Sequence, residues 1–349
     1  DFILGRNVNM GLGNVVKLTL RCIPYSLFVK LYPIFKKSRI SFLSDFSDEV
    51  YYKRFLKESP LINDTDNYIN KVKKKNKYCL IKRGVWEYKI ANFCFVKDML
   101  SLILWCLDRG YLPIVSCYPH ESQEYYKDDV SLWDMFYFQP FTKKNVSNIT
   151  VTEECPIQVS SIHPSFSDCY NKEMISFWNK IFNRFVKYNN EVSKYIDAEY
   201  NKLVKGKKVV ACVMRSTDYT KTKPTGHPKQ PSIDEVFCKL DSVMDEYGID
   251  YIYLATEDGN IADEFKKKFP GKIIENKRRY FNEIFDNINA DRISAVHFDR
   301  ENDNYLKMIE YMSSIDLVSK CDYLVTGLCG GSQMAIYRNG NTYKYSYIF

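Results

Sequence analysis

From residue 206 onward, short apolar runs alternate with amphipathic helical patterns. Four of the runs are predicted strands, at 209–214, 251–255, 273–274 and 323–325. Apolar residues recur at helical spacing over 233–247, 261–269 and 305–320, and a Gly-rich turn leads into a further helix from Ser332. Strands that alternate with helices in this way predict a mostly parallel, doubly wound α/β sheet.

A shorter pattern of the same kind lies upstream. The runs 78–81 and 112–115 are predicted strands, and the helical pattern 94–108 between them ends before Gly110, a favoured helix stop. Strand, helix and strand over about forty residues form one βαβ unit. An aromatic, irregular stretch at 116–165 and a helical pattern over 170–204 follow this unit.

The residues before 77 do not share the α/β pattern. The apolar stretch 18–35 contains Arg21, Lys30 and two prolines, whereas a membrane-spanning helix needs about 20 predominantly apolar residues. Two interpretations stay open for it, a packed helical hairpin and a helix lying in a membrane interface. The basic run 71–77 indicates a solvated linker, with attraction to anionic lipid as the alternative.

The change of pattern at this basic run predicts three parts of the chain. They are an N-terminal extension at 1–76, a Rossmann-like domain at 77–205 and a second one at 206–349.

Composition narrows the classes of protein without choosing one. The 349 residues carry a net charge of +7, which is too small and too diffuse to predict a nucleic-acid partner. The 11 cysteines are dispersed without a C-x-x-C pair, so we expect free thiols rather than a zinc site or a disulfide framework. The chain begins with Asp1 and ends in an apolar stretch, so it could be a piece of a longer protein.

Ligands of open α/β sheets bind beyond the carboxyl ends of the strands, which makes the residues after each strand candidates for a site. Arg215 and Asp218 follow the strand 209–214. An Arg leaving a buried strand needs an anion, and a phosphate suits its planar guanidinium, although a structural Arg–Asp pair is the alternative. The cationic loop 220–232 contains His227, which could close over a charged ligand or be an ordinary surface residue.

The later strand ends add two further groups. Glu257 and Asp258 follow 251–255, where they could accept hydrogen bonds from a ribose, but Asp258 is also a suitable N-cap for the next helix. Gly330, Gly331 and Ser332 open a helix whose unpaired N–H groups could cradle a phosphate. Together these strand ends predict a site for a nucleoside diphosphate. The D-x-D triplet at 64–66 lies in a polar turn, so no metal site is predicted.

The residues at these strand ends resemble the α1,6-fucosyltransferases, whose outline the protein O-fucosyltransferases share. The resemblance covers about 206–340 and extends loosely to 78–115. It rests, in order and spacing, on 213–218 (VMRSTD), 227–228 (HP), 253–258 (YLATED), 322–326 (DYLVT) and 331–333 (GSQ). It implies a GT-B fold of two Rossmann-like doubly wound domains facing across a cleft, here with an N-terminal extension. It also implies a metal-independent, inverting transfer from a donor that is usually GDP-fucose.

Carried over by position, the resemblance implies a role for each strand end. Arg215 would hold the donor diphosphate, and Asp218 would support Arg215 or the sugar. Ser332 would bind phosphate with the backbone of Gly330 and Gly331. Asp258 would contact the nucleotide.

The chain also departs from the family pattern. A His and a second Arg are missing around Arg215, and Lys223 stands where the family has a Glu that serves as a base. The base that takes the proton of the acceptor hydroxyl is therefore unassigned, with His227, Asp218 and Glu257 as candidates.

The resulting hypothesis is a fucosyltransferase that adds sugar to a glycan or lipid-linked oligosaccharide in bacterial surface polysaccharide synthesis. We expect it in the cytoplasm or peripherally at the inner face of the membrane. Two alternatives stay open, a catalytically inactive protein that binds a sugar nucleotide or glycan, and a transferase of another GDP-sugar. Acceptor specificity would lie in the N-terminal domain, where the aromatic residues of 118–141 offer either sugar-stacking surfaces or core.

Overall fold

The structure is a computed structural model that describes residues 19–38, 41–85, 93–119, 131–142, 149–217, 219, 227–288 and 295–349. Its described residues form two compact units. The first unit takes them from 1–83, 97–118 and 139–163, and the second from 84–96, 119–138 and 164–349. The three predicted parts of the chain stay a prediction.

The first unit combines N-terminal helices with a small sheet. The helices are α2 (Tyr25–Lys36), α3 (Ser41–Glu58), α4 (Pro60–Asn63) and α5 (Thr65–Lys75). The sheet has the order β2-β1-β3, with β1 (Tyr78–Val85), β2 (Leu112–Pro119) and β3 (Glu153–Glu154). Helix α6 (Phe93–Asp108) joins β1 to β2, which confirms the predicted strands and helix. Strand β3, parallel to β1, comes from the stretch that we expected to be irregular.

The buried carboxylate of Asp108 ties the N-terminal helices to the end of α6. It accepts hydrogen bonds from the hydroxyls of Tyr25 on α2, Tyr51 on α3 at 3.0 Å, and Ser59 before α4 at 2.5 Å. The Tyr68 hydroxyl on α5 adds a bond to the Leu107 carbonyl at 2.9 Å. Burial raises the pKa of Asp108 to about 6, against the effect of these hydroxyl donors. Helix α2, which covers the second half of the apolar stretch 18–35, packs against α3, which lies outside that stretch.

The basic run after residue 70 is a helix end and not the linker that we predicted. Residues up to Lys75 belong to α5, because Ile69 and Val72 bury one face of that helix. Three lysines occupy its last turn, where positive charge favours a helix carboxyl end. Asn76 ends the helix in the left-handed conformation, with φ at 49°.

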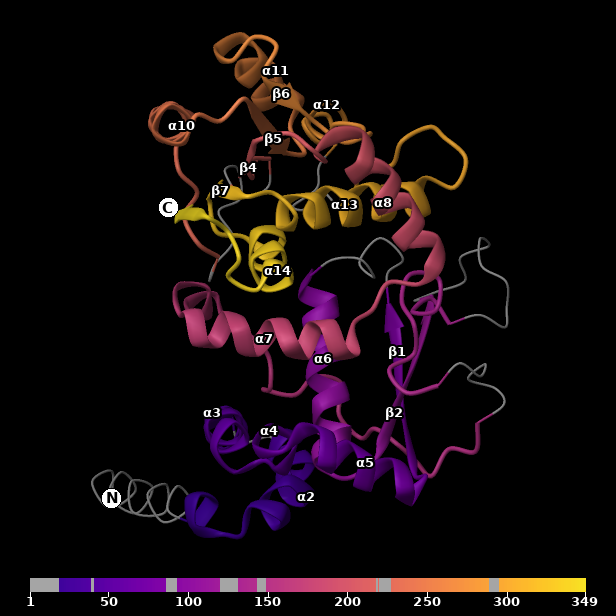
Figure 1. Cartoon of the computed structure of the whole chain (residues 1–349). Helices are drawn as coiled ribbons and strands as arrows, with labels where there is room; N and C mark the ends of the chain where they lie inside the picture. Colours follow the sequence, from indigo (N-terminus) through magenta and orange to yellow (C-terminus); the bar gives the residue numbers. More distant parts are fainter. Residues whose placement is uncertain are drawn as a thin grey trace, which may run out of the picture. The chain divides into compact units, whose positions relative to one another are not determined.

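The second unit is built on a five-stranded sheet of order β6-β5-β4-β7-β8 in which all the described pairs are parallel (Figure 1). The strands are β4 (Val209–Val213), β5 (Tyr251–Ala255), β6 (Ile273–Ile274), β7 (Tyr323–Thr326) and β8 (Tyr345–Ile348). The doubly wound parallel sheet is thus confirmed. Strand β8, formed by the last apolar stretch of the chain, was not predicted.

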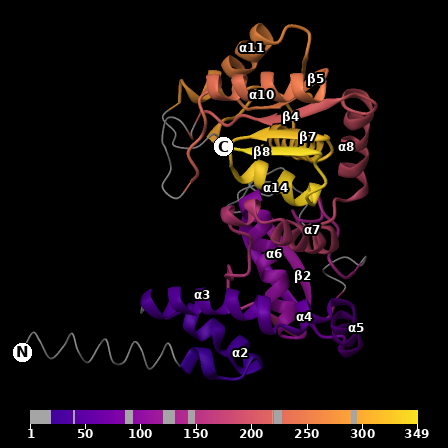
Figure 2. The same ribbon diagram turned by 60° about the vertical axis from the view of Figure 1, so that its left-hand side comes forward.

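Helices cover both faces of this sheet. Figure 2 shows α10 (Ile233–Tyr247) and α11 (Gly259–Lys268) on one side and α14 (Gly330–Asn339) on the other. Val210 and Cys212 of β4 share a core with Leu240 of α10 and Phe265 of α11. Because strand side chains alternate, Ala211 between them points to the opposite face, where α13 (Asp303–Ser319) packs on β4 and β5.

The predicted helical pattern over 170–204 forms two helices, α7 (Lys172–Phe185) and α8 (Asn190–Leu203). Asn189 separates them, and its side chain caps α8 by accepting a bond from the Val192 amide at 3.0 Å. Two short helices also belong to the second unit, the 3-10 helix η3 (Phe166–Tyr170) and α12 (Asn282–Phe285).

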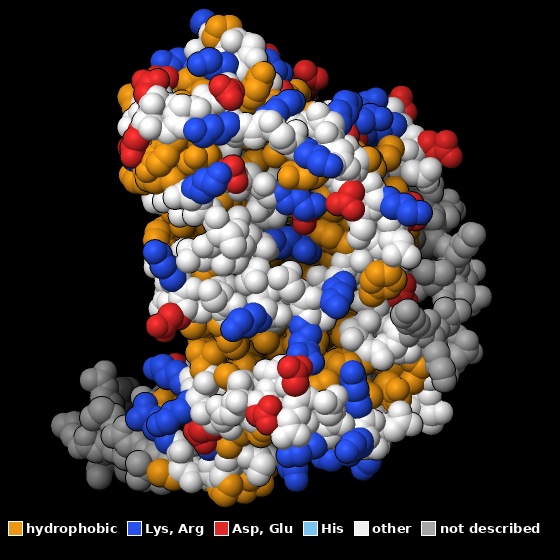
Figure 3. Space-filling model, viewed as in Figure 1, with side chains coloured by type: hydrophobic (Ala, Val, Ile, Leu, Met, Phe, Trp, Pro, Cys, Tyr) orange, Lys and Arg blue, Asp and Glu red, His pale blue; other side chains and the backbone are white. Residues whose placement is uncertain are grey.

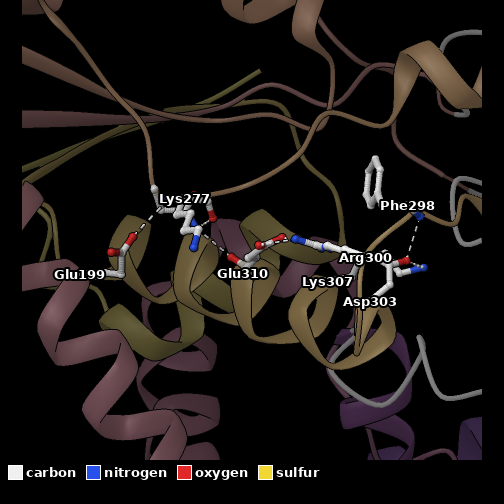
Figure 4. A network of polar contacts seen from close by, with 8 residues as sticks. Glu199, Lys277, Phe298, Arg300, Asp303, Lys307 and Glu310 are labelled. Carbon is white, nitrogen blue, oxygen red and sulfur yellow. Dashed lines mark hydrogen bonds and ion pairs between the residues drawn. The ribbon is translucent and has the colours of Figure 1, made fainter. Parts of the chain in front are cut away.

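A polar network fastens the segments after β6 and before α13 to the α13 helix (Figure 4). Arg300 pairs with Glu310 at 2.8 Å and with Asp303 at 2.7 Å. Lys307 bonds to the Val296 carbonyl at 2.7 Å and pairs with Asp303. Although burial opposes it, the Phe298 amide and these cations hold the pKa of Asp303 below its usual value. Such buried, fully paired charges fix one arrangement of a segment that has little regular structure.

Candidate functional site

The carboxylate of Glu257 organises the carboxyl ends of β4 and β5. It is 8% exposed and accepts bonds from the Ser216 amide at 2.9 Å and the Thr217 hydroxyl at 2.8 Å. The Arg215 guanidinium pairs with the same oxygen at 2.9 Å. Glu257, which follows the neighbouring strand, is therefore one partner of Arg215. The Arg–Asp pair across the turn stays a prediction, because Asp218 lies outside the described residues.

Arg215 leads from this buried carboxylate toward the surface. Its guanidinium lies 5.1 Å from the ring centroid of Tyr219, and its side chain is 18% exposed. The Tyr219 hydroxyl shares a hydrogen bond of 2.8 Å with Nδ1 of the exposed His227, and the two rings meet edge to face. Arg215 and His227, both predicted site residues, are thus connected through Tyr219.

The turn that carries these residues has an unusual backbone. Thr217, which is fully buried, has φ at +42°. A β-branched residue rarely adopts this left-handed conformation, and such strain occurs mainly where surrounding contacts enforce it. Here the bond from Thr217 to Glu257 is one of the contacts that hold it. The predicted residues Asp218 and Lys223 lie outside the described residues.

Asp258 acts as a helix cap in the structure. Its side chain accepts a bond from the Asn260 amide at 2.9 Å at the start of α11, which confirms the capping interpretation. The Gly259 amide donates to Asn282 at 2.8 Å. A role of Asp258 in binding a nucleotide stays a prediction.

The Gly-rich turn after β7 leads into α14, which begins at Gly330, two residues earlier than predicted. The Ser332 hydroxyl is fully buried, accepting from the Cys329 amide at 2.8 Å and donating to the Cys329 carbonyl at 3.1 Å. The first amides of a helix have no acceptor within it, so the N–H groups of Gly330 and Gly331 are those that an anion would meet.

The two glycines differ in what their missing side chains permit. A Cβ on Gly331 would lie 2.9 Å from Cδ1 of Ile315, so α13 already requires a small residue there. A Cβ on Gly330 would meet its nearest atoms only at 3.8 Å. Close packing therefore explains why residue 331 is a glycine, whereas it does not explain why residue 330 is one.

The structure adds a second arginine that the sequence analysis missed. Nη1 of Arg278, four residues after β6, donates to the Thr256 carbonyl at the end of β5, and its buried Nε has no hydrogen-bond partner among the described residues. A signal existed, because the basic triplet 277–279 follows the predicted strand 273–274.

Tyr311 of α13 also lies at this edge. Its hydroxyl is 3.4 Å from the position of a Cβ on Gly331. Burial raises the pKa of Tyr311, with Cys329 adding to the effect and Arg215 opposing it. The residue was not predicted, because a tyrosine in a helical pattern gives no sign of facing a strand end.

The aromatic residues that we considered as sugar-stacking surfaces differ in solvent exposure. Trp133, Phe136 and Tyr137 are fully buried, so they belong to the core of the second unit. Tyr118 of β2 is exposed.

Within the described part of the chain, no three His, Cys, Asp or Glu side chains form a group that could hold a metal ion. The eleven cysteines are free thiols.

Comparisons with known proteins find likeness in structure only. No model of a known protein family matches the chain, and no curated protein matches it in sequence. A crystal structure of POFUT1 in complex with GDP is 11% identical with a TM-score of 0.44, over 78% of this chain and 98% of that one. NodZ α-1,6-fucosyltransferase soaked with GDP-fucose is 9% identical with a TM-score of 0.38, over 74% and 91%. NodZ from Bradyrhizobium is 8% identical with a TM-score of 0.39 over the same shares.

Proposed function

We propose that the protein is a metal-independent, inverting glycosyltransferase of the GT-B type that uses GDP-fucose. The observation that carries the proposal is the gathering of positive charge at one edge of the parallel sheet. The guanidinium groups of Arg215 and Arg278 and the amino end of α14 follow strands β4, β6 and β7. A diphosphate is the ligand class that planar guanidinium groups and helix amides bind together.

The reaction is a single displacement. The acceptor hydroxyl oxygen attacks the anomeric carbon while the bond from that carbon to the diphosphate oxygen breaks, and the electron pair leaves with GDP. Arg215 exchanges its partner Glu257 for the diphosphate and stabilises the charge that develops on it. Glu257 keeps the turn in place through Ser216 and Thr217.

We propose that His227 is the base that takes the proton of the acceptor hydroxyl. Glu257 already accepts two hydrogen bonds and forms an ion pair with Arg215, so it is less available to take a proton from the acceptor. His227 is exposed at the end of the chain of contacts that begins at Arg215, and an imidazole is the side chain that most often serves as a general base. Of the three candidates His227, Asp218 and Glu257, we therefore propose His227 as the base.

Donor binding and turnover test the proposal together. We expect calorimetry to detect GDP binding, and GDP-fucose to release GDP with water as a slow acceptor, with or without EDTA. Arg215→Ala should lower the rate of release at least about 100-fold, by analogy with the loss of one charge-stabilising donor. Arg279→Ala is the matched control, because it removes an exposed guanidinium from the basic triplet 277–279.

The outcomes separate the alternatives. Absence of GDP binding would overturn the proposal. Binding with no release of GDP from any GDP-sugar would favour the catalytically inactive binding protein. Release of GDP only from a GDP-sugar other than GDP-fucose would mean that this other sugar nucleotide is the donor. Loss of GDP release in the presence of EDTA would contradict the metal-independent reaction.

We also propose that the acceptor is a glycan or lipid-linked oligosaccharide of a bacterial surface polysaccharide, met at the inner face of the membrane. No described helix is long and apolar enough to cross a membrane. Helix α2 nevertheless exposes Leu27 (43%) and Ile34 (66%), seven residues apart on one face, with the exposed Lys30 between them. Figure 3 shows Lys and Arg side chains on the surface of the first unit, with Asp and Glu among them.

Vesicle binding tests this membrane contact. We expect the protein to sediment with vesicles containing anionic phosphatidylglycerol but less with neutral phosphatidylcholine. Replacing Leu27 and Ile34 by Ser should weaken sedimentation, whereas the same change at the exposed Phe138 should not. Equal sedimentation of all variants would contradict a role of α2.

A further inference from the structure

Three side chains with unused hydrogen-bond donors gather at the carboxyl end of α14. Arg338 belongs to the last turn of this helix, and its side chain is 10% exposed. Its Nε and Nη2 atoms are buried and have no hydrogen-bond partner among the residues that the structure describes. The same is true of the buried hydroxyls of Tyr137 and Tyr188. We define these three residues as the Arg338 cluster.

The members of the cluster are neighbours within the second unit. The Arg338 guanidinium lies over the Tyr188 ring, 4.0 Å from the ring centroid. The rings of Tyr137 and Tyr188 stack with their centroids 5.8 Å apart. The two tyrosines form an antiparallel bridge, and residues directly opposite each other in such a bridge extend their side chains to the same face. One cation and two hydroxyls therefore share one buried region.

The positive charge of Arg338 is poorly matched in this region. Asp316 of α13 pairs with Arg338, but its Oδ1 atom is 3.9 Å from Nε, which is too long for a hydrogen bond. Lys320 lies closer to Asp316, at 2.9 Å, and also 3.5 Å from the exposed Asp197. A guanidinium stays charged and only donates hydrogen bonds, so its burial is costly without acceptors. The cluster thus lacks an acceptor that carries negative charge.

We propose that the Arg338 cluster is a binding site for a small monovalent anion of the halide class, such as chloride. Nε and Nη2 of Arg338 and the hydroxyls of Tyr137 and Tyr188 donate hydrogen bonds to it. One guanidinium matches one negative charge, whereas a buried dianion would carry a second charge without a partner. Asp316 opposes any anion here, and its pairing with Lys320 weakens that repulsion.

This site is separate from the proposed donor site. Arg338 lies eight residues after Gly330, which places the two about 12 Å apart along the axis of α14. An anion at the Arg338 cluster would stabilise the second unit by joining the end of α14 to the bridge between Tyr137 and Tyr188.

Thermal unfolding of the full chain in different sodium salts tests the binding in solution. At equal ionic strength, surface charges are screened alike, and gluconate is too large for a buried site. We expect chloride and bromide to raise the unfolding temperature by about 2–4 °C over gluconate once the halide reaches about ten times its dissociation constant. Equal unfolding temperatures in all three salts would overturn the proposal.

Conservative variants assign the effect to the cluster. The double change Tyr137→Phe and Tyr188→Phe keeps both rings but removes both hydroxyls, so the difference between chloride and gluconate should shrink at least by half. Tyr253→Phe is the matched control, because Tyr253 on β5 also buries a hydroxyl that has no hydrogen-bond partner in the described part of the chain. It should keep the full difference. A double variant that responds to chloride like the native chain would contradict the site.

Bromide soaked into crystals of the protein locates the anion directly. Its anomalous signal should appear within hydrogen-bond reach of the Arg338 guanidinium and the two hydroxyls. A water molecule in that place, or bromide only at the surface as an adventitious ion only, would show that the cluster does not select an anion. None of these measurements involves GDP or turnover, so their failure and the failure of the proposed transferase function are distinguishable.

Discussion

The two units each bury a carboxylate, and the two differ in what surrounds it. Glu257 in the second unit meets a guanidinium, a backbone amide and a hydroxyl. The donors on Asp108 in the first unit are three neutral hydroxyls, and burial raises its pKa to about 6. A buried carboxylate that is paired with a cation, such as Glu257, can hold a turn in place. A buried carboxylate that meets only hydroxyls, such as Asp108, joins helices and makes the stability of its unit depend on pH.

Removing Glu257 should have the largest effect on stability. Glu257→Ala leaves Arg215 largely buried without its carboxylate and removes the acceptor of Ser216 and Thr217, so we expect a loss of about 3–5 kcal/mol in the free energy of unfolding. Urea denaturation measures it. Glu264→Ala, at an exposed position of α11, is the control. A loss below about 1 kcal/mol would mean that the turn holds its shape without this carboxylate.

Asp108 should make the stability of the first unit depend on pH. Its pKa of about 6 in the folded state lies above the ordinary value of 3.8, so the folded state binds this proton more tightly. The contribution of Asp108 to the free energy of unfolding is therefore complete below about pH 4 and is lost as the pH rises through about 6. It amounts to roughly 3 kcal/mol in total.

Comparison of the native chain with Asp108→Asn isolates this effect, because all other carboxylates cancel. We expect the difference in unfolding free energy, native minus variant, to increase as the pH falls from 7 to 4. Asp263→Asn, at an exposed position of α11, is the control. A flat curve for Asp108→Asn would show that Asp108 titrates alike in both states.

The smallest effects should separate packing from binding at the start of α14. Gly331→Ala places a methyl 2.9 Å from Ile315 Cδ1, so we expect a loss of about 1 kcal/mol that Ile315→Val relieves. Gly330→Ala has room for its methyl and should preserve stability, yet weaken GDP binding if its backbone meets the phosphate. Thermal unfolding and calorimetry distinguish the two. Unchanged GDP affinity in Gly330→Ala would remove this glycine from the proposed site.

Hydrophobic periodicity predicted most of the elements around the site. Buried strands such as β4 and amphipathic helices such as α10 differ in local pattern, so the sequence alone determined that a parallel sheet ends at Arg215, Glu257 and the Gly-rich turn. The sequence pattern did not predict β8, because the short segment 345–348 is a strand only through its pairing with β7. It read the lysines of α5 as a linker because the burial of Ile69 and Val72 is a tertiary fact.

The pairing of side chains required the tertiary structure. Arg215 and Glu257 are 42 positions apart in number, and only the parallel register of β4 and β5 brings their strand ends together. The same holds for Arg278, whose guanidinium reaches the Thr256 carbonyl at the end of β5 from the segment after β6. Local sequence patterns report which residues are buried, whereas the partner of a charge depends on contacts between distant segments of the chain.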